Sequence, residues 1–433
     1  MAIQALLVIL AVLLVLLFLG VPISYAIAVS SLTAILSSID LNVAVLTAAQ
    51  RTFVGMSKFS LTAIPFFILA GNIMNQGGIA KRLVDFVMSI LGKLPGALLV
   101  TNIGTNALFG AISGSASAAA AAVGSMIRDG AEEQGYDPAV TAATNAASSC
   151  SGLLIPPSNA LITYSLASGG TSVAALFMAG YIPGIIWALA CCVVGVILAK
   201  KLGYKGTPGK FDWKNLGICT LRALPSLSLI VVVIGGIVGG IFSATEGSAI
   251  AVVYSLILAF CYRSIDLKGL WKIIVDSAKM SGMVVFLVGV SNILGWVMAF
   301  LQIPDAVAAA LLALTSNKYV ILLIMNVILL VSGTFMDVTP AILIFTPLFL
   351  PICQSFGMST IQFGMILVYN LCIGNITPPV GNALFVGIKV GRTSLEKIMP
   401  YMLMYYVAII GGLLLVTYIP AVSLTLPQLT GLA

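Results

Sequence analysis

One polar segment, Gly374-Asn375-Ile376-Thr377-Pro378-Pro379-Val380-Gly381-Asn382, interrupts a run without charged residues that extends from 338 to 388. Two consecutive prolines remove two amide donors and free the carbonyls of the preceding helical turn. In lipid such groups cannot stay unpaired, so broken backbone persists only where it lines a cavity or is buried in protein. The segment therefore predicts a discontinuous membrane helix with polar backbone at its break.

The same kind of break occurs earlier in the chain, which indicates an internal repeat. Ile155-Pro156-Pro157-Ser158-Asn159-Ala160-Leu161 matches Thr377 to Leu384 with one insertion. Two further pairs keep the same order: Asn72-Ile73-Met74 with Asn292-Ile293-Leu294, and Ser113-Gly114-Ser115 with Ser332-Gly333-Thr334. The shift is roughly 220 residues, so we interpret the chain as two copies of one unit.

Composition places both copies in a membrane. The 433 residues are 60% hydrophobic and only 8% charged, against roughly 25% charged residues in soluble proteins. Charge-free runs long enough for spans of about 20 residues predict a polytopic helical membrane protein. The chain has no histidine, which excludes imidazole catalysis and histidine metal ligands, and its seven cysteines lack CxxC spacing.

The charged residues predict the orientation. Six basic residues and a single acid, Asp212, lie in 200–222, and neither terminus carries a Lys or Arg within 35 residues of the chain end. Short basic loops stay cytoplasmic, so we expect this linker inside, both termini outside, and an odd number of crossings in each half. The expected units are a first inverted repeat at 1–199, a basic cytoplasmic linker at 200–222 and a second inverted repeat at 223–433. We therefore interpret the lysines of 200–222 as a signal of membrane orientation rather than as a nucleic-acid binding site.

Four polar segments lie inside the apolar runs: 110–125, 147–159, 332–340 and 374–382. Their carbonyls, hydroxyls and amides form a set of hard oxygen ligands, as in the sodium sites of inverted-repeat transporters. The alternative is that their small residues only permit close helix packing.

Two acids lie in apolar sequence. Asp337 could contact an ion or a substrate, or cap a hairpin tip. For Glu246 we favour a structural role as the acid of a helix start, with Ser243 as its capping partner.

At these residues the chain resembles a known family. The resemblance rests on the motifs Gly114–Ala118, Ser151–Ser158, Leu176–Gly184, Gly240–Glu246, Ser332–Pro340 and Thr377–Asn382. They resemble, in collinear order, the large membrane (M) subunit of tripartite ATP-independent periplasmic (TRAP) transporters, and the sialic acid type is one candidate among them.

The resemblance implies an all-α polytopic membrane protein of the ion transporter superfamily. Two inverted-topology repeats would supply re-entrant hairpins and discontinuous helices, arranged as a scaffold plus an elevator-type transport domain. The expected coupling ion is Na⁺, with two or more ions per cycle. The expected partners are a small membrane (Q) subunit and a soluble periplasmic substrate-binding (P) protein, without an ATPase, in a bacterial inner membrane.

The resemblance also assigns residues by position. The first sodium site would comprise Ser113, Gly114, Ser149, Gly152 and Ile155. The second would comprise Gly333, Gly374, Thr377 and Val380, largely through carbonyls, while Ser115, Ser158 and Asp337 would face the substrate. The chain departs from the usual pattern at Cys150 and Asn159, which affects the details of the first site.

Family substrates are carboxylates. A polar pocket that bears Asp337 and has no basic residue nearby in sequence favours a polyhydroxylated monoanion, such as sialic acid or a related sugar acid, over a C4-dicarboxylate. We therefore expect a sodium-coupled importer and no enzyme activity. The alternatives are a channel or membrane scaffold subunit of a larger complex, and a primary pump, for which the chain has no phosphate-binding motif.

Overall fold

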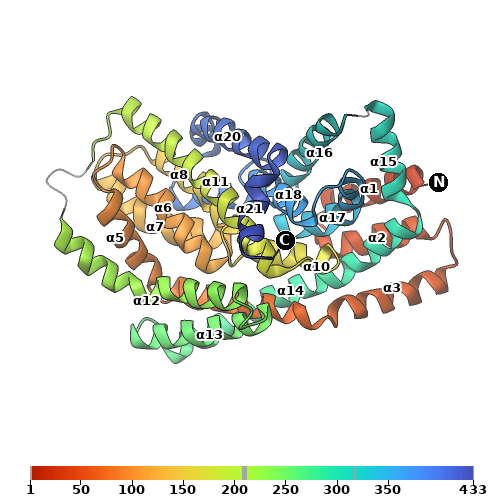
Figure 1. Cartoon of the computed structure of the whole chain (residues 1–433), viewed down its shortest axis with the longest axis horizontal. Coiled ribbons are helices and arrows are strands. Elements are labelled where there is room, and N and C mark those ends of the chain that lie inside the picture. Colours follow the sequence, from red (N-terminus) through yellow and green to blue (C-terminus); the bar gives the residue numbers. More distant parts are fainter. Residues whose placement is uncertain (1, 207–211, 316, 433) are drawn as a thin grey trace.

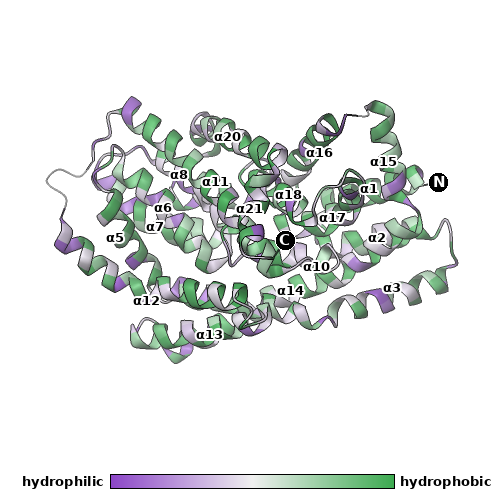
Figure 2. Cartoon of the chain, in the orientation of Figure 1, coloured by the Kyte–Doolittle hydropathy of each residue, from purple (hydrophilic) through white to green (hydrophobic). Residues whose placement is uncertain are grey.

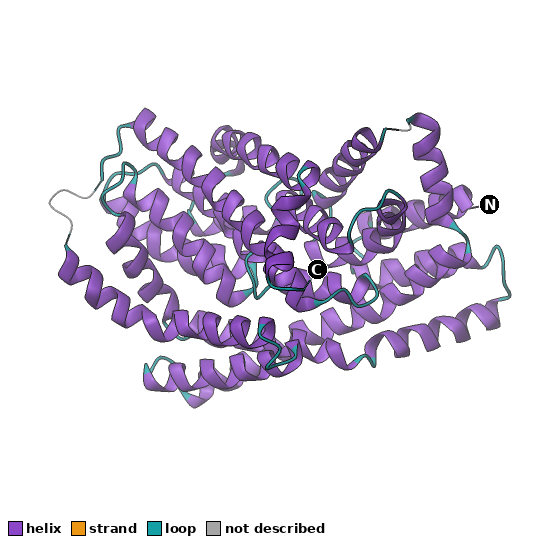
Figure 3. Cartoon of the chain, in the orientation of Figure 1, coloured by secondary structure: helices purple, strands orange, loops and turns teal. Residues whose placement is uncertain are grey.

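The computed structural model describes residues 2–206, 212–315 and 317–432, and these residues form helices joined by short loops, without strands (Figure 3). Within this part of the chain, six helices are long and apolar enough to cross a membrane, or up to eight if each bent pair counts as one span. Most of the ribbon is apolar, with hydrophilic residues confined to short stretches (Figure 2). The predicted polytopic all-α class is confirmed.

The first part of each half forms an outer group of helices. In the first half these are α1 (Ala2–Phe18), α2 (Ile23–Ile35), α3 (Leu41–Met56), η1 (Phe59–Thr62), α4 (Ala63–Gln76) and α5 (Ile79–Leu91). In the second half they are α12 (Trp213–Val238), α13 (Ala244–Cys261), α14 (Leu267–Phe300) and α15 (Ile303–Leu314). Helices α3, α12, α13 and α14 run along one long edge of the molecule (Figure 1). Helix α14 packs against α2, α3 and α4, so the two halves share this layer.

The second part of each half forms an inner group. It comprises the hairpin α6 (Ala97–Ser113) and α7 (Ala116–Glu133), the broken helix α8 (Pro138–Ser149), α9 (Ser151–Leu154) and α10 (Asn159–Ala167), and the long α11 (Val173–Leu202). Its counterparts are the hairpin α16 (Lys318–Gly333) and α17 (Val338–Ser355), the broken helix α18 (Thr360–Gly374) and α19 (Asn382–Val390), α20 (Leu395–Tyr418) and α21 (Pro420–Leu429). Both predicted Pro-Pro breaks and both hairpins are therefore present.

The two inner groups interlock. Helix α10, the second piece of the first broken helix, packs against α17 of the other half. Helix α19, its counterpart, packs against α7 and α8. Each broken helix thus rests its second piece on the hairpin of the opposite half, and polar breaks from both halves come together in the interior.

Structure extends the repeat beyond what the motifs revealed. Cys150 and Cys372 each lie six residues before the first proline of their Pro-Pro pair, and Gly169 and Arg392 each follow the C-cap residue of α10 and α19. Both loop residues have positive φ, 85° and 49° respectively. Because glycine enters this region freely and arginine does not, the shared conformation is a feature of the repeat rather than of the residue type.

Helix α11 runs the length of the inner group, and its two ends serve to locate the other features. Its 30 residues span about 45 Å at 1.5 Å per residue, more than the ~30 Å hydrocarbon core of a bilayer. It begins at the diglycine loop Gly169–Ser172, which we call the diglycine end, and finishes at Leu202, which we call the linker end. The basic linker expected at 200–222 starts in its last turn, and residues 207–211, with Lys210, lie outside the described part of the chain.

Candidate functional site

The first break places two serines at helix starts. Ser115 follows the hairpin turn at Gly114, and its hydroxyl accepts a hydrogen bond from the Ala118 amide at the start of α7. Ser158 follows the cis Pro156–Pro157 bond, and its fully buried hydroxyl accepts from the Leu161 amide. Both predicted substrate residues are therefore N-caps, beside amides that favour negative charge.

Glycine pairs fasten each hairpin to its broken helix. Gly110 of α6 and Gly152 of the first break are so close that a Cβ on either would overlap with the other's backbone. Gly374 stands equally close to Gly333 at the second hairpin tip, where its Cβ would lie 2.6 Å from the Gly333 Cα. The predicted residues Gly152 and Gly374 thus lie at backbone contacts that leave no room for a side chain, and a Cβ on Gly333 would meet the Gly374 Cα at a tight 3.3 Å.

The second break is tied to its hairpin by backbone. The Val380 amide donates to the Thr334 carbonyl at 3.1 Å, across the gap between the break and the hairpin tip. Thr377 donates its hydroxyl to the Ile373 carbonyl at 2.6 Å, and Tyr406 of α20 donates to the Ile376 carbonyl at 2.6 Å. Side chains therefore satisfy part of the backbone that the two prolines, which lack amide donors, leave unpaired.

The two breaks touch each other. The Asn375 amide donates to the Cys150 sulfur at 3.8 Å. The side-chain oxygens of Asn375 and Asn159 are buried without a hydrogen-bond partner. Buried amide oxygens without donors, beside broken backbone, are a donor set that suits a hard cation such as Na⁺.

The remaining predicted residues divide into two groups. Ser113 and Gly114 lie at the first tip, where Gly114 faces the Pro157 carbonyl and Asn159. Ser149 instead bonds to the Ala146 carbonyl of its own helix, and Ile155 packs against Gly184 of α11. Ser113 and Gly114 thus lie against the first break, whereas Ser149 and Ile155 contact their own helix and α11, respectively.

Asp337 occupies the position in the second half that Ser115 occupies in the first, the N-cap of the second hairpin helix. Its carboxylate makes no side-chain capping bond, the residue is exposed, and it lies within electrostatic range of Cys372. Glu246, by contrast, forms a complete capping box with Ser243, which confirms its predicted structural role. Of the two acids in apolar sequence, Asp337 is the one whose carboxylate is not committed to a helix cap.

Two buried hydrogen bonds made by asparagine side chains were not predicted from the sequence motifs. The Asn106 amide of α6 donates to the Ser148 hydroxyl of α8 at 2.8 Å, and the Asn370 amide of α18 donates to the Asn326 oxygen of α16 at 2.7 Å. All four residues are buried. Each link joins a hairpin to its broken helix. Asn106 and Asn326 have the same separation as Asn72 and Asn292, which is the signal that could have identified them.

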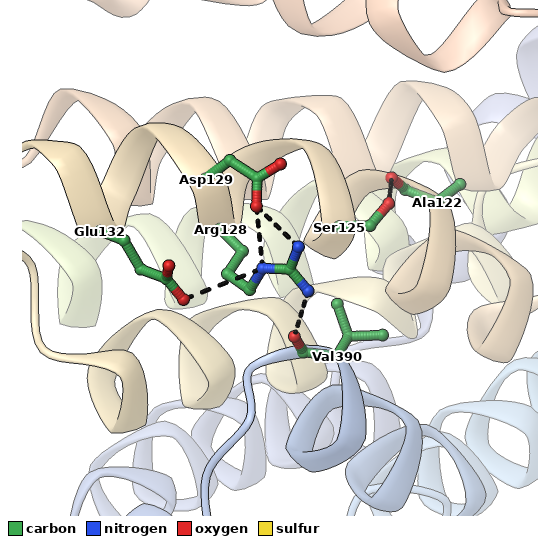
Figure 4. A network of polar contacts seen from close by, with 6 residues as sticks. All are labelled: Ala122, Ser125, Arg128, Asp129, Glu132 and Val390. Carbon is green, nitrogen blue, oxygen red and sulfur yellow. Dashed lines mark hydrogen bonds and ion pairs between the residues drawn. The ribbon is translucent and has the colours of Figure 1, made fainter.

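The inner group is closed at the linker end. Arg128 of α7 donates to the Val390 carbonyl at the end of α19 at 3.2 Å, and it also pairs with Asp129 and Glu132 (Figure 4). The cavity beside this contact, which we call the latched cavity, measures about 10 Å³, and Tyr136 lines it. Tyr136 stacks on Tyr204, just after α11, and desolvation by burial raises the pKa of its hydroxyl.

The inner group is open at the diglycine end. A cavity of about 360 Å³ lies between α10 and α17 on one side and α3 and α14 on the other. We call it the basic cavity, because its charged lining residues are Arg51 and Lys58, with Gly169 of the diglycine loop at its edge. The two cavities thus lie at opposite ends of a helix of about 45 Å, each beside the second piece of a broken helix.

The fold and these breaks define a polytopic helical membrane protein with paired discontinuous helices. Residues 10–422 match the family model described as "Tripartite ATP-independent periplasmic transporter, DctM component". The chain belongs to this family of transporter large permeases.

Two of the relatives whose names state a substrate show how the named substrates vary. The C4-dicarboxylate TRAP transporter large permease protein DctM of Pseudomonas aeruginosa is 37% identical over 93% of this chain and 93% of its own length. The sialic acid TRAP transporter large permease protein SiaM of Vibrio cholerae is 33% identical over 96% of each chain. This chain is therefore similar to permeases that are named for different organic anions.

A solved structure shares the fold. The YdaH transporter of Alcanivorax borkumensis, whose crystal structure is described as having an unusual topology, aligns with a TM-score of 0.61 over 88% of each chain at 16% identity. At this identity the likeness concerns the fold alone.

Proposed function

We propose that this chain is the sodium-coupled transport subunit that imports a carboxylate substrate delivered by a periplasmic binding protein. The observation that carries the proposal is the difference between the two ends of α11. The latched cavity of about 10 Å³ has room for roughly one water molecule, whereas the basic cavity measures about 360 Å³. Two repeat-related ends, one closed and one open, are what a single state of an alternating-access transporter requires.

In this proposal the hairpin tips and breaks form the moving part. Sodium binds the backbone and amide oxygens around Gly114–Asn159 and Gly333–Val380, and the substrate lies against the N-caps Ser115, Ser158 and Asp337. Helices of the outer layer act as the scaffold, and the moving part slides along them as an elevator. The basic linker faces the cytoplasm, which puts the diglycine end and the open cavity on the periplasmic side.

The partners follow from the family. The system is tripartite, so the proposed complex adds a small membrane subunit and a soluble binding protein. The binding protein would deliver the carboxylate to the diglycine end, where the cavity is open. Relatives named for C4-dicarboxylate and sialic acid leave both substrate classes as candidates.

The test is uptake into proteoliposomes that contain the whole membrane complex, with the binding protein outside. Uphill accumulation under an inward sodium gradient, without ATP, supports the proposal. Uptake that persists when potassium replaces sodium contradicts the ion assignment. Flux that only follows the substrate gradient at channel rates supports the alternative of a channel subunit. Asp337→Asn should lower uptake at least tenfold while the complex still assembles.

A further inference from the structure

No basic residue lies near Asp337 in the sequence, but the basic cavity is lined by two. Arg51 comes from α3, and Lys58 comes from the 59° bend between α3 and η1–α4. No acid lines this cavity, and the ion pairs of Arg128 do not include Arg51 or Lys58. Two cations without an anionic partner, in a chain with 8% charged residues, leave a net positive wall.

The guanidinium of Arg51 lies over an aromatic ring. Its Cζ lies 5.8 Å from the centroid of the Trp296 ring, which also lines the cavity. A guanidinium over an aromatic face keeps its N–H groups in its own plane, where they can bind a carboxylate through two parallel hydrogen bonds. Arg51 is exposed, so these donors remain accessible to a ligand.

The other polar lining groups are engaged within their own helix. Ser291 donates to the Leu287 carbonyl at 2.7 Å, and the Asn292 amide donates to the Val288 carbonyl at 2.8 Å. The rest of the lining is largely apolar, from α10, α14 and α17. At about 360 Å³ the cavity lies in the usual range for small-molecule sites.

The cavity lies along the helix that begins at the second hairpin tip. Leu343 of α17 lines it, and Leu343 lies six residues after Asp337, a rise of about 9 Å along the helix. The part of α17 that lines the cavity therefore begins roughly one and two-thirds helical turns from the tip. The two basic residues belong to the outer layer, whereas Asp337 belongs to the inner group.

We propose that Arg51 and Lys58 form a separate anion site that holds the carboxylate of an organic anion before it reaches the hairpin tips. This site rests on the proposed function for its role in uptake, but it binds without sodium, because its cations are supplied by the protein itself. It would accept dicarboxylates as well as sugar acids, since either cation can pair with a carboxylate.

The first measurement is binding in the absence of sodium. The complex of this chain with its small subunit, in phosphatidylcholine nanodiscs and choline chloride, is titrated with succinate, gluconate and N-acetylneuraminate. We expect binding of at least one anion that weakens at least tenfold in Arg51→Gln/Lys58→Gln and recovers in part when Lys58→Arg replaces Lys58→Gln. Wild-type complex that binds none of the three, or a double variant that binds as well as wild type, overturns the proposal.

Lys318→Gln is the matched control. Lys318 also lies over an aromatic ring, at 5.2 Å from the Tyr319 centroid, and lines a different cavity of about 170 Å³. Its loss should leave sodium-free binding within twofold of wild type. An equal loss of binding in this variant would mean that general surface charge is responsible, which also overturns the proposal.

A lipid phosphate is the other anion that such a site could bind. If adding phosphatidylglycerol to the nanodiscs abolishes binding of all three anions, the cavity is a lipid headgroup site and the proposal is wrong. In proteoliposomes the double variant should raise KM at least tenfold with kcat within twofold. Sodium-free binding that depends on Arg51 and Lys58, without any sodium-driven uptake, would refute the proposed function and leave the anion site standing.

Discussion

The two ends of α11 carry the same architecture in different states. At the linker end, α19 is held against α7 by the Arg128–Val390 contact, and almost no space remains. At the diglycine end, the corresponding pair α10 and α17 borders an open cavity, and the cations come from α3 and the following bend. The repeat therefore does not require the two ends to be alike. We expect the Arg128 side chain to help keep the linker end closed.

The two Pro-Pro breaks also differ from each other, in how far their residues are exposed. Ser158 in the first break is fully buried, whereas Val380 in the second is 39% exposed, and Asn382 beside it is exposed as well. The second hairpin tip, with Asp337, is likewise more exposed than the first. The second half thus presents its polar break to its surroundings, and the first half encloses its own.

The strongest test of the repeat is to disrupt the contact that both halves share. Gly152→Ala and Gly374→Ala each place a methyl group into backbone of the neighbouring hairpin, and overpacking costs about 1–3 kcal/mol or more. We expect both variants to lower the thermal stability of the complex and to reduce uptake at least tenfold. Fluorescence-detected size exclusion after heating measures the first effect.

Gly411→Ala is the control, because its Cβ would meet open space. It should be neutral or slightly stabilising, since alanine is favoured over glycine in a helix. If Gly374→Ala behaves like this control while Gly152→Ala does not, the second contact is not a structural element of the repeat.

The next test concerns the closed end. Arg128→Gln removes a charged hydrogen bond, worth about 1–2 kcal/mol for a partly exposed group, so an open linker end should become roughly tenfold more populated. Thr141 lines the latched cavity and is buried. Labelling of Thr141→Cys by a polar maleimide should therefore accelerate about tenfold in the Arg128→Gln background.

Asp129→Asn provides the comparison, because it removes the ion pair but keeps the bond from Arg128 to the Val390 carbonyl. Its labelling rate should stay within twofold of the parent. Equal rates in all three chains would show that Arg128 does not hold this end closed.

A smaller effect is expected at the second break. Thr377→Val removes the hydroxyl that donates to the Ile373 carbonyl but keeps the side-chain shape. Apparent sodium affinity, measured as the sodium dependence of uptake, should weaken several-fold, about 1 kcal/mol. Thr334→Val should have little effect, because the Val380 amide binds the Thr334 carbonyl rather than its hydroxyl. Unchanged sodium dependence in Thr377→Val would remove this residue from the site.

The smallest effect is expected at Glu246, the acid that is committed to a helix cap. Ser243→Ala breaks the capping box and should cost about 1 kcal/mol of stability. Uptake per folded complex should not change, in contrast with Asp337→Asn. A selective loss of uptake would give the Ser243–Glu246 cap a functional role that its geometry does not suggest.

Sequence predicted the elements that local chemistry dictates. Paired prolines, Ser-Gly tips and the Ser243–Glu246 spacing are short-range signals, and each is present in the structure as a break, a turn or a cap. The glycine contacts and asparagine links could not be predicted from local pattern, because each depends on how a hairpin packs on a broken helix. The basic cavity could not be predicted for the same reason, since Arg51 and Lys58 are hundreds of residues from Asp337 in sequence.

The correspondence between Ser115 and Asp337 has an electrical consequence. The repeat gives one hairpin helix a neutral cap and the other a carboxylate. On the proposed mechanism, an empty moving part that carries this carboxylate across the membrane transfers negative charge, whereas each bound sodium ion offsets one such charge. A potential of 100 mV acts on one charge with about 2.3 kcal/mol. With two sodium ions and one monocarboxylate bound, the loaded part would carry no net charge, so membrane voltage would act on the empty step. In a chain with asparagine at 337 the voltage would act on the loaded step instead.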